Sequence, residues 1–180
     1  MTRDDDTMLV KACLQGDQTA FDQLVDRYEG TLFNATYRIT GSVEDAMDAT
    51  QAAFVNAYEK LHTFNPSHRF FSWIYRIACN QALNLVSRRR PEAELDLDTP
   101  ANGGDPEAAF GEAEAGGFLQ RALMELTPQY RVVVILKHLQ GLSYREIGEL
   151  LEIPEKTVKS RLFTARQRLR SILLEKGFVP

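Results

Sequence analysis

An acidic stretch near the middle of the chain constrains the fold more than any other feature. Residues 91–116 hold eight acidic residues and no lysine or arginine, together with three prolines, four glycines and few large apolar side chains. Such a segment cannot bury enough apolar surface to offset the entropy lost when it becomes ordered. The sequence therefore predicts a flexible acidic linker at 91–116 that joins two small domains, 1–90 and 117–180.

The N-terminal domain carries apolar residues at three- and four-residue steps, which is typical of helices. One helical pattern runs from Phe21 to Phe33, and a second begins at Ser42, whose side chain is a suitable N-cap, and continues to Leu61. A third runs from about Phe70 to Arg89. No stretch alternates at a period of two, so we expect an all-α fold.

The C-terminal domain has the same helical character and ends in a helix-turn-helix pattern. A helix is expected from Thr127-Pro128, and a short one after Ser143, which forms a capping box with Glu146. Ile153-Pro154 then makes a turn, and a final helix is expected over Glu155 to Leu174. A short helix, a tight turn and a longer helix are the layout of a DNA-binding helix-turn-helix.

The composition excludes several classes of protein. The chain has 180 residues, 44% of them apolar, and no apolar run near the roughly 20 residues that span a bilayer. The N-terminus lacks the apolar stretch of a signal peptide, so we expect a soluble, cytoplasmic protein. Cys13 and Cys79 are too few for a disulfide framework or a thiolate metal site, and the three histidines have no metal-ligand spacing. No cofactor and no metal are predicted.

The final helix has a strongly basic surface, although the net charge of the chain is -4. From Lys156 to Arg170 it carries six basic residues and no acid. A solvated surface helix is the plain alternative, but such helices usually mix acids with bases. We therefore favour binding to duplex DNA, with polar side chains meeting base edges and cations meeting phosphates. The candidate DNA-binding residues are Lys156, Thr157, Lys159, Ser160, Arg161, Phe163, Thr164 and Arg166.

A cluster of aromatic residues lies in the N-terminal domain, where six of the 17 aromatics fall between positions 58 and 75. Aromatic faces with amides and cations nearby are suited to unstacked single-stranded bases. The alternative is that most of these rings belong to the core, which we favour for Tyr58, Phe71 and Tyr75. Phe64 lies in a polar loop and is expected to be exposed.

Four stretches of the chain closely resemble the extracytoplasmic-function sigma factors of bacterial RNA polymerase. They are FDQLVDRYEGTLFNATYRIT, EDAMDATQAAFVNAYEKL, FFSWIYRIACNQALNLVSRRRP and LTPQYRVVVILKHLQGLSYREIGELLEIPEKTVKSRLFTARQRLR, in the family's order. The most specific parts are the F-x-x-W-x-Y-R-I-A-x-N run, G-L-S-Y-x-E-I and T-V-K-S-R-L.

The resemblance implies that the chain directs core polymerase to promoters. The first domain would dock on the clamp helices of the largest polymerase subunit through Asp45, Asp48, Gln51 and Phe54. The family often has Gln-Glu where this chain has Gln51-Ala52. The same domain would capture the melted minus-ten element. The residues implied for that role are Thr63, Phe64, Ser67, His68, Trp73, Arg76, Asn80, Asn84 and Arg88.

The resemblance also assigns roles to the rest of the chain. The final helix would read the minus-thirty-five element in the major groove, with Thr164 where the family often has Arg. The acidic linker would thread through polymerase near the RNA exit path. Core polymerase, with its clamp and flap regions, promoter DNA and an anti-sigma factor are the implied partners, and no small-molecule substrate is expected.

Two other functions were weighed. An enzyme is disfavoured because the sequence has no recognisable catalytic motif and no glycine-rich phosphate loop. A conventional regulator would bind duplex operator as a dimer without polymerase. A stoichiometric complex with core polymerase distinguishes a sigma factor from such a regulator.

Overall fold

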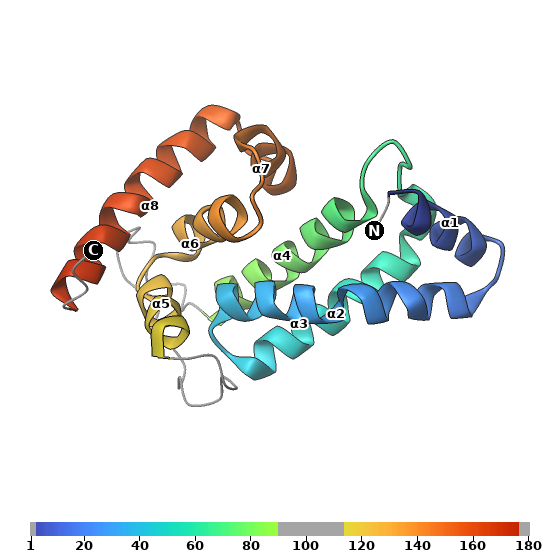
Figure 1. Cartoon of the computed structure of the whole chain (residues 1–180), viewed down its shortest axis with the longest axis horizontal. Helices are drawn as coiled ribbons and strands as arrows, with labels where there is room; N and C mark the ends of the chain where they lie inside the picture. The colour runs from blue at the N-terminus through green and yellow to red at the C-terminus, as the bar shows by residue number, and fades with distance from the viewer. Residues whose placement is uncertain (1–2, 90–113, 177–180) are drawn as a thin grey trace.

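The computed structural model describes residues 3–89 and 114–176, and every regular element in these two ranges is helical (Figure 1). The all-α fold predicted from the sequence is confirmed for this part of the chain. Nearly all of the predicted acidic linker, residues 91–113, lies outside the described residues. No helix in the described ranges is long and apolar enough to cross a membrane.

Residues 3–89 form the N-terminal lobe, whose helices pack around a core of apolar side chains. Its elements are α1 (Arg3–Leu14), α2 (Gln18–Thr40), α3 (Val43–Glu59), the 3-10 turn η1 (Leu61–Thr63) and α4 (Phe70–Arg89). The bounds of α4 are those predicted from the sequence. Ser42 caps α3 as expected, because its hydroxyl accepts a hydrogen bond from the backbone N–H of Asp45 at 3.3 Å.

Helix α1 was not predicted, and contacts distant in sequence hold it in place. The carboxylate of Asp6 accepts hydrogen bonds from the guanidinium of Arg27 and from the hydroxyl of Tyr28, both on α2. Burial and the bond to Asp6 raise the pKa of the Tyr28 phenol above its ordinary value. The paired polar groups therefore fasten α1 to α2.

Residues 114–176 form the C-terminal lobe. Its elements are α5 (Glu114–Met124), α6 (Pro128–Val134), the π-helical turn η3 (Ile135–Leu139), α7 (Tyr144–Leu151) and α8 (Glu155–Glu175). The capping box predicted at Ser143 and Glu146 is present, with both reciprocal bonds formed. Helix α5 begins at Glu114, inside the segment predicted as linker.

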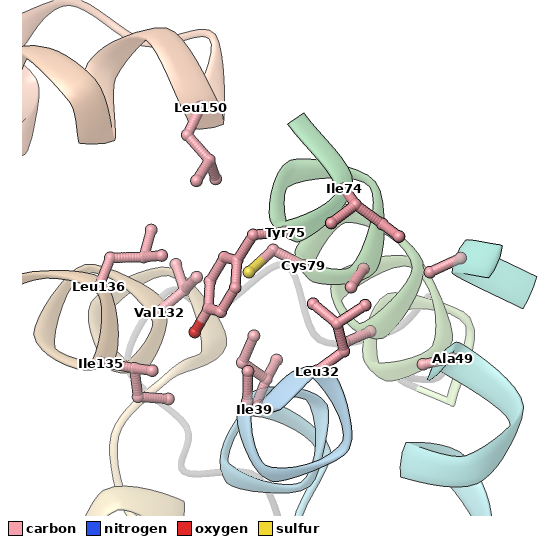
Figure 2. Packing of buried hydrophobic residues seen from close by; sticks show 14 of the residues in the cluster. Leu32, Ile39, Ala49, Ile74, Tyr75, Cys79, Val132, Ile135, Leu136 and Leu150 are labelled. Atoms are coloured by element: carbon pink, nitrogen blue, oxygen red, sulfur yellow. The ribbon is translucent and has the colours of Figure 1, made fainter. Parts of the chain in front are cut away.

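The two lobes are packed against each other through a continuous apolar core. Tyr75 and Cys79 on α4 point toward Val132 and Leu136 of the C-terminal lobe, and Ile39 of α2 lies beside them (Figure 2). All five side chains are buried. The sequence predicted two domains and did not predict this shared core.

Arg131 on α6 is the largest fully buried side chain and links the lobes. Its guanidinium donates to the backbone carbonyls of Leu123, Met124 and Leu126 at 2.9–3.0 Å, and to the carbonyl of Ile39 in the N-terminal lobe. Burial lowers the pKa of Arg131 to about 10, so the group is still protonated at neutral pH. Carbonyls at the ends of helices carry partial negative charge, and they compensate the buried cation here.

Candidate nucleic-acid interface

Helix α8 is the second helix of a helix-turn-helix and presents a basic face to solvent. Val158, Leu162 and Ala165 are buried against the rest of the lobe. The opposite face is exposed, and the ring of Phe163 is 64% accessible. A large apolar ring with that exposure is unusual on a solvated helix and suits a surface that is covered when a partner binds.

The structure places the predicted duplex-binding residues around the exposed part of α8. Those exposed are Lys156, Lys159, Ser160, Phe163 and Arg166, while Thr157, Arg161 and Thr164 are half-buried. They occupy the N-terminal two-thirds of the helix. In a helix-turn-helix this is the part that enters the major groove.

Lys159 is oriented by two neighbours. Its Nζ lies 2.6 Å from Oε1 of Glu155, one turn earlier, and 5.7 Å from the centre of the Tyr144 ring. The bond to Glu155 raises the pKa of Lys159 above its ordinary value. The sequence reasoning missed Glu155 because the basic run begins one residue later, at Lys156.

Arg166 contacts a histidine from outside α8. Its Nε donates to Nε2 of His138, on η3, at 3.3 Å. Burial, followed by the positive charges of Arg166 and Lys137, lowers the pKa of His138 below 6.5. The imidazole is therefore neutral at pH 7 and can accept this hydrogen bond. In the sequence, His138 was weighed only as a metal ligand.

The loop before α4 differs from expectation at Phe64. This ring is only 7% exposed, so the prediction that it is accessible was wrong. It packs against Phe70 and Trp73, with ring centres 5.5 and 5.6 Å away. The polar neighbours that suggested exposure, His62 and Thr63, are exposed, while the phenyl ring turns inward.

Polar side chains line one face of α4. Trp73, Asn80 and Asn84 follow one another at seven- and four-residue steps, which places them on the same side of the helix. Both asparagines are exposed and the indole is half-buried. The other predicted residues of this surface are the half-buried Arg76 and the exposed Arg88, Ser67, His68 and Thr63. One side of α4 therefore carries an indole ring and two amides.

An apolar groove of about 830 Å³ lies between α2 and α3. Among the predicted polymerase-contacting residues, Gln51 and Phe54 line it, Asp48 is exposed nearby, and Asp45 is buried at the start of α3. The groove is lined by Phe21, Val25, Glu29, Gly30, Phe33, Met47, Thr50, Gln51, Phe54, Val55, Tyr58 and Glu59.

Of the three rings expected in the core, only Tyr75 is fully buried. Tyr58 is 48% exposed at the rim of the groove, so its expected burial was wrong, and Phe71 is half-buried. Tyr58 contacts Phe21 edge-on, at 5.0 Å between ring centres, and this contact holds it over the groove rather than in the core.

The end of the loop before α4 lies near α7, which α4 contacts. The pKa of Glu146, on α7, is lowered first by its hydrogen bonds to Ser143, and the positive charge of Arg69, just before α4, contributes to the shift. Among the described residues no cluster of histidine, cysteine or carboxylate side chains could hold a metal ion.

Two family matches fall on the two lobes. Residues 24–92 match the family described as sigma-70 region 2, and residues 119–169 match sigma-70, region 4. The fold and its basic helix-turn-helix are therefore those of a sigma factor, a subunit that gives RNA polymerase its promoter specificity.

Similar proteins extend this match to nearly the whole chain. The sequence is 35% identical to the ECF RNA polymerase sigma factor SigW of Bacillus subtilis, over 91% of this chain and 94% of the relative. It is also 35% identical to the ECF RNA polymerase sigma-E factor of Escherichia coli K12, over 91% of this chain and 92% of the relative. The chain belongs to the extracytoplasmic-function (ECF) sigma factor family. It binds core RNA polymerase and directs promoter-specific initiation, recognising the minus-ten element as melted strand and the minus-thirty-five element as duplex.

A solved structure has the same overall arrangement. CnrH, determined in complex with the cytosolic domain of CnrY, superposes with a TM-score of 0.68 at 29% identity, over 96% of this chain and 99% of that chain. The sequence-based identification of the family is confirmed.

Proposed function

We propose that the two lobes divide the promoter between them. The domain at 117–180 reads the minus-thirty-five duplex with α8, the domain at 1–90 holds the melted minus-ten strand and core polymerase, and 91–116 connects them. The observation that carries this proposal is the exposed basic face of α8 on an intact helix-turn-helix, with Phe163 at its centre. A helix of this kind docks in the major groove.

The face of α4 is the proposed surface for the melted strand. Trp73 offers a half-buried indole ring for stacking, and Asn80 and Asn84 offer donors and acceptors for base edges. Because Phe64 is buried, it supports Trp73 from behind instead of stacking on a base. The exposed loop residues Ser67 and His68 are then the groups nearest an extruded base.

Energy considerations support action as a polymerase subunit. Opening about ten base-pair steps costs on the order of 14 kcal/mol at ~1.4 kcal/mol each. Three stacked bases return only about 3–9 kcal/mol. The remainder has to come from contacts outside this chain, which polymerase can supply.

The groove between α2 and α3 is the proposed polymerase-docking surface. Its apolar floor is rimmed by exposed Met47, Val55 and Tyr58, and Gln51 adds hydrogen-bonding capacity. Clusters of exposed apolar side chains mark protein interfaces. We assign the groove to the clamp helices, with Asp48 at its edge. The buried Asp45 contributes by starting α3 and offers little surface to a partner.

The remaining assignments follow the family. CnrH is described in complex with the cytosolic domain of CnrY, and we propose a comparable anti-sigma factor as a partner of this chain. We also propose that it acts in the cytoplasm, as a transcription initiation factor without catalytic activity of its own.

Run-off transcription tests the proposal. The purified chain is added to core polymerase on a library of genomic fragments, and start sites are mapped. We expect a stoichiometric complex and a set of start sites that share two spaced elements. A core enzyme that gains no start sites would contradict the proposed function, and tight operator binding without polymerase would support a conventional regulator instead.

A further inference from the structure

The first residue of α8 is an acid, at the end of the helix that enters the major groove in the proposed function. Glu155 is the first residue of the helix, its side chain is 46% exposed, and the six basic residues from Lys156 to Arg170 follow it. In helix-turn-helix proteins the N-terminal residues of the recognition helix contact base edges. A carboxylate at this point needs a reason, because phosphate oxygens repel it.

Lys159 pairs with Glu155 in the free protein, and Arg145 adds a longer-range attraction. Lys159 lies 2.6 Å from its Oε1. Glu149 is the main cause of the raised pKa of Arg145, and Glu155 contributes to the same shift from across the turn. The paired ammonium offsets the charge of the carboxylate, so the repulsion from the DNA backbone is reduced. The side chain therefore stays at the tip of the helix without cancelling its attraction to DNA.

The chemistry of base edges identifies the ligand of this carboxylate. In the major groove a carboxylate accepts a hydrogen bond from the N4 amino group of cytosine, whereas the edges of guanine and thymine present oxygen acceptors that repel it. Lysine is suited to the O6 and N7 acceptors of guanine. Glu155 and Lys159 together therefore suit a C·G pair, with the carboxylate on the cytosine and the lysine on the guanine of the same or a neighbouring pair.

We propose that Glu155 is a specificity-determining residue that reads a cytosine in the minus-thirty-five element. This inference rests on the proposed role of α8 and adds a base preference to it. It also gives a role to the pair in the free protein: Lys159, whose Nζ lies near the Tyr144 ring, keeps the carboxylate at the tip of the helix.

The experiment uses the full chain with core polymerase and a promoter library whose minus-thirty-five element is randomised. With the wild-type chain we expect a C·G preference at one base pair. Glu155→Gln should move that preference to A·T, because glutamine is bidentate to adenine, and should reduce discrimination for cytosine by about 5- to 150-fold. Glu155→Ala should remove the preference without creating another.

Glu149→Gln is the matched control, since Glu149 is an exposed acid in an i,i+4 pair with Arg145 on the neighbouring helix. It should leave the base preference unchanged. Equal strengthening of all sequences by Glu155→Gln would mean that the carboxylate only repels phosphates, and an unchanged preference would mean that it reads nothing; either result overturns the inference.

A third outcome concerns Lys159. Glu155→Gln and Lys159→Ala could both weaken the preference at the same base pair, with no preference for adenine in its place. Glu155 would then act only through Lys159, and direct reading of the cytosine would be overturned. Failure of the proposed function is distinguishable from all of these, because the wild-type chain would then select nothing in the minus-thirty-five window.

Discussion

The guanidinium of Arg131 donates a hydrogen bond to the backbone carbonyl of Ile39, 92 residues earlier in the chain. The same side chain bonds three carbonyls of its own lobe. One buried cation thus satisfies the end of α2 in the N-terminal lobe and the end of α5 in the C-terminal lobe. At the contact between the lobes, four of the five N–H donors of this guanidinium therefore bond protein oxygen.

Arg131→Met should lower the free energy of unfolding by more than about 3 kcal/mol, because four buried carbonyls lose their donor. The free energy of unfolding of Arg131→Lys should fall between those of the wild type and Arg131→Met, since one ammonium cannot reach carbonyls at the ends of two helices. Urea denaturation at pH 7 measures both. A methionine variant as stable as the wild type would show that these carbonyls find other partners.

A second contact between the lobes predicts an effect at Gly41. This residue has φ +76, and a Cβ built there would lie 2.3 Å from Cε of Met124 on α5. Gly41→Ala should therefore cost more than the ~1–2 kcal/mol of left-handed strain alone. Gly141 is the matched control, with φ +68 and no atom within 4 Å of a Cβ.

Thermal or urea unfolding of both variants separates strain from collision. Gly141→Ala should show the strain alone. In a Met124→Ala background, Gly41→Ala should cost no more than Gly141→Ala does, because the obstructing side chain is gone. Equal costs of the two glycine substitutions in the wild-type background would argue against the collision.

Tyr75 predicts a gain in stability. Its hydroxyl is buried between the lobes and has no hydrogen-bond partner among the described residues. Tyr75→Phe should raise the free energy of unfolding by about 1 kcal/mol, because an unsatisfied polar group is removed. Tyr28→Phe is the matched control and should act in the opposite direction, since the Tyr28 hydroxyl donates to Asp6 at 2.5 Å. Loss of stability in both variants would mean that the Tyr75 hydroxyl is hydrogen-bonded in solution.

Local patterns in the sequence predicted most of the helices, and the features they missed depend on long-range contacts. The bounds of α4 and the capping box at Ser143 follow from signals within a few residues. Helix α1 depends on Asp6, whose partners are 21 and 22 residues away. An arginine such as Arg131 is normally read as a surface residue, and nothing in its neighbourhood indicates burial.

The prediction of the site residues was limited in the same way, because local sequence does not show which side chains meet in space. The exposed basic face of α8 follows directly from helical periodicity. Phe64 was misplaced because its neighbours in sequence are polar, whereas its neighbours in space are Phe70 and Trp73. Glu155 was overlooked because a search for positive charge passes over an acid that is paired with one of the bases.

The capping box of α7 predicts a pH dependence of stability. Hydrogen bonds from Ser143 hold the pKa of Glu146 below its ordinary value of 4.5. A carboxylate with a lowered folded-state pKa contributes stability that is complete above the unfolded-state value and is lost as the pH falls through the lowered one. Wild type and Glu146→Gln should therefore differ most above pH 5 and converge in acid.

Urea unfolding at pH 7, 5 and 3 measures this difference. Ser143→Ala should cost about 1 kcal/mol at neutral pH, as is typical of a lost N-cap. A constant difference between wild type and Glu146→Gln at all three pH values would show that the charge of Glu146 does not contribute.

The exposed residues of α8 should separate into two classes when DNA binding is measured. Lys159→Ala and Ser160→Ala remove groups that we assign to base edges, so each should change which minus-thirty-five sequence is preferred, by roughly 1–3 kcal/mol. Arg166→Ala removes a cation that His138 holds at the side of the helix. It should weaken all duplexes alike and reduce the slope of log affinity against log salt by about 0.9. Titrations of the holoenzyme on promoter duplexes at several salt concentrations distinguish the classes. Identical effects from both would contradict the division between base readers and phosphate contacts, since a residue that meets only phosphate carries no sequence information.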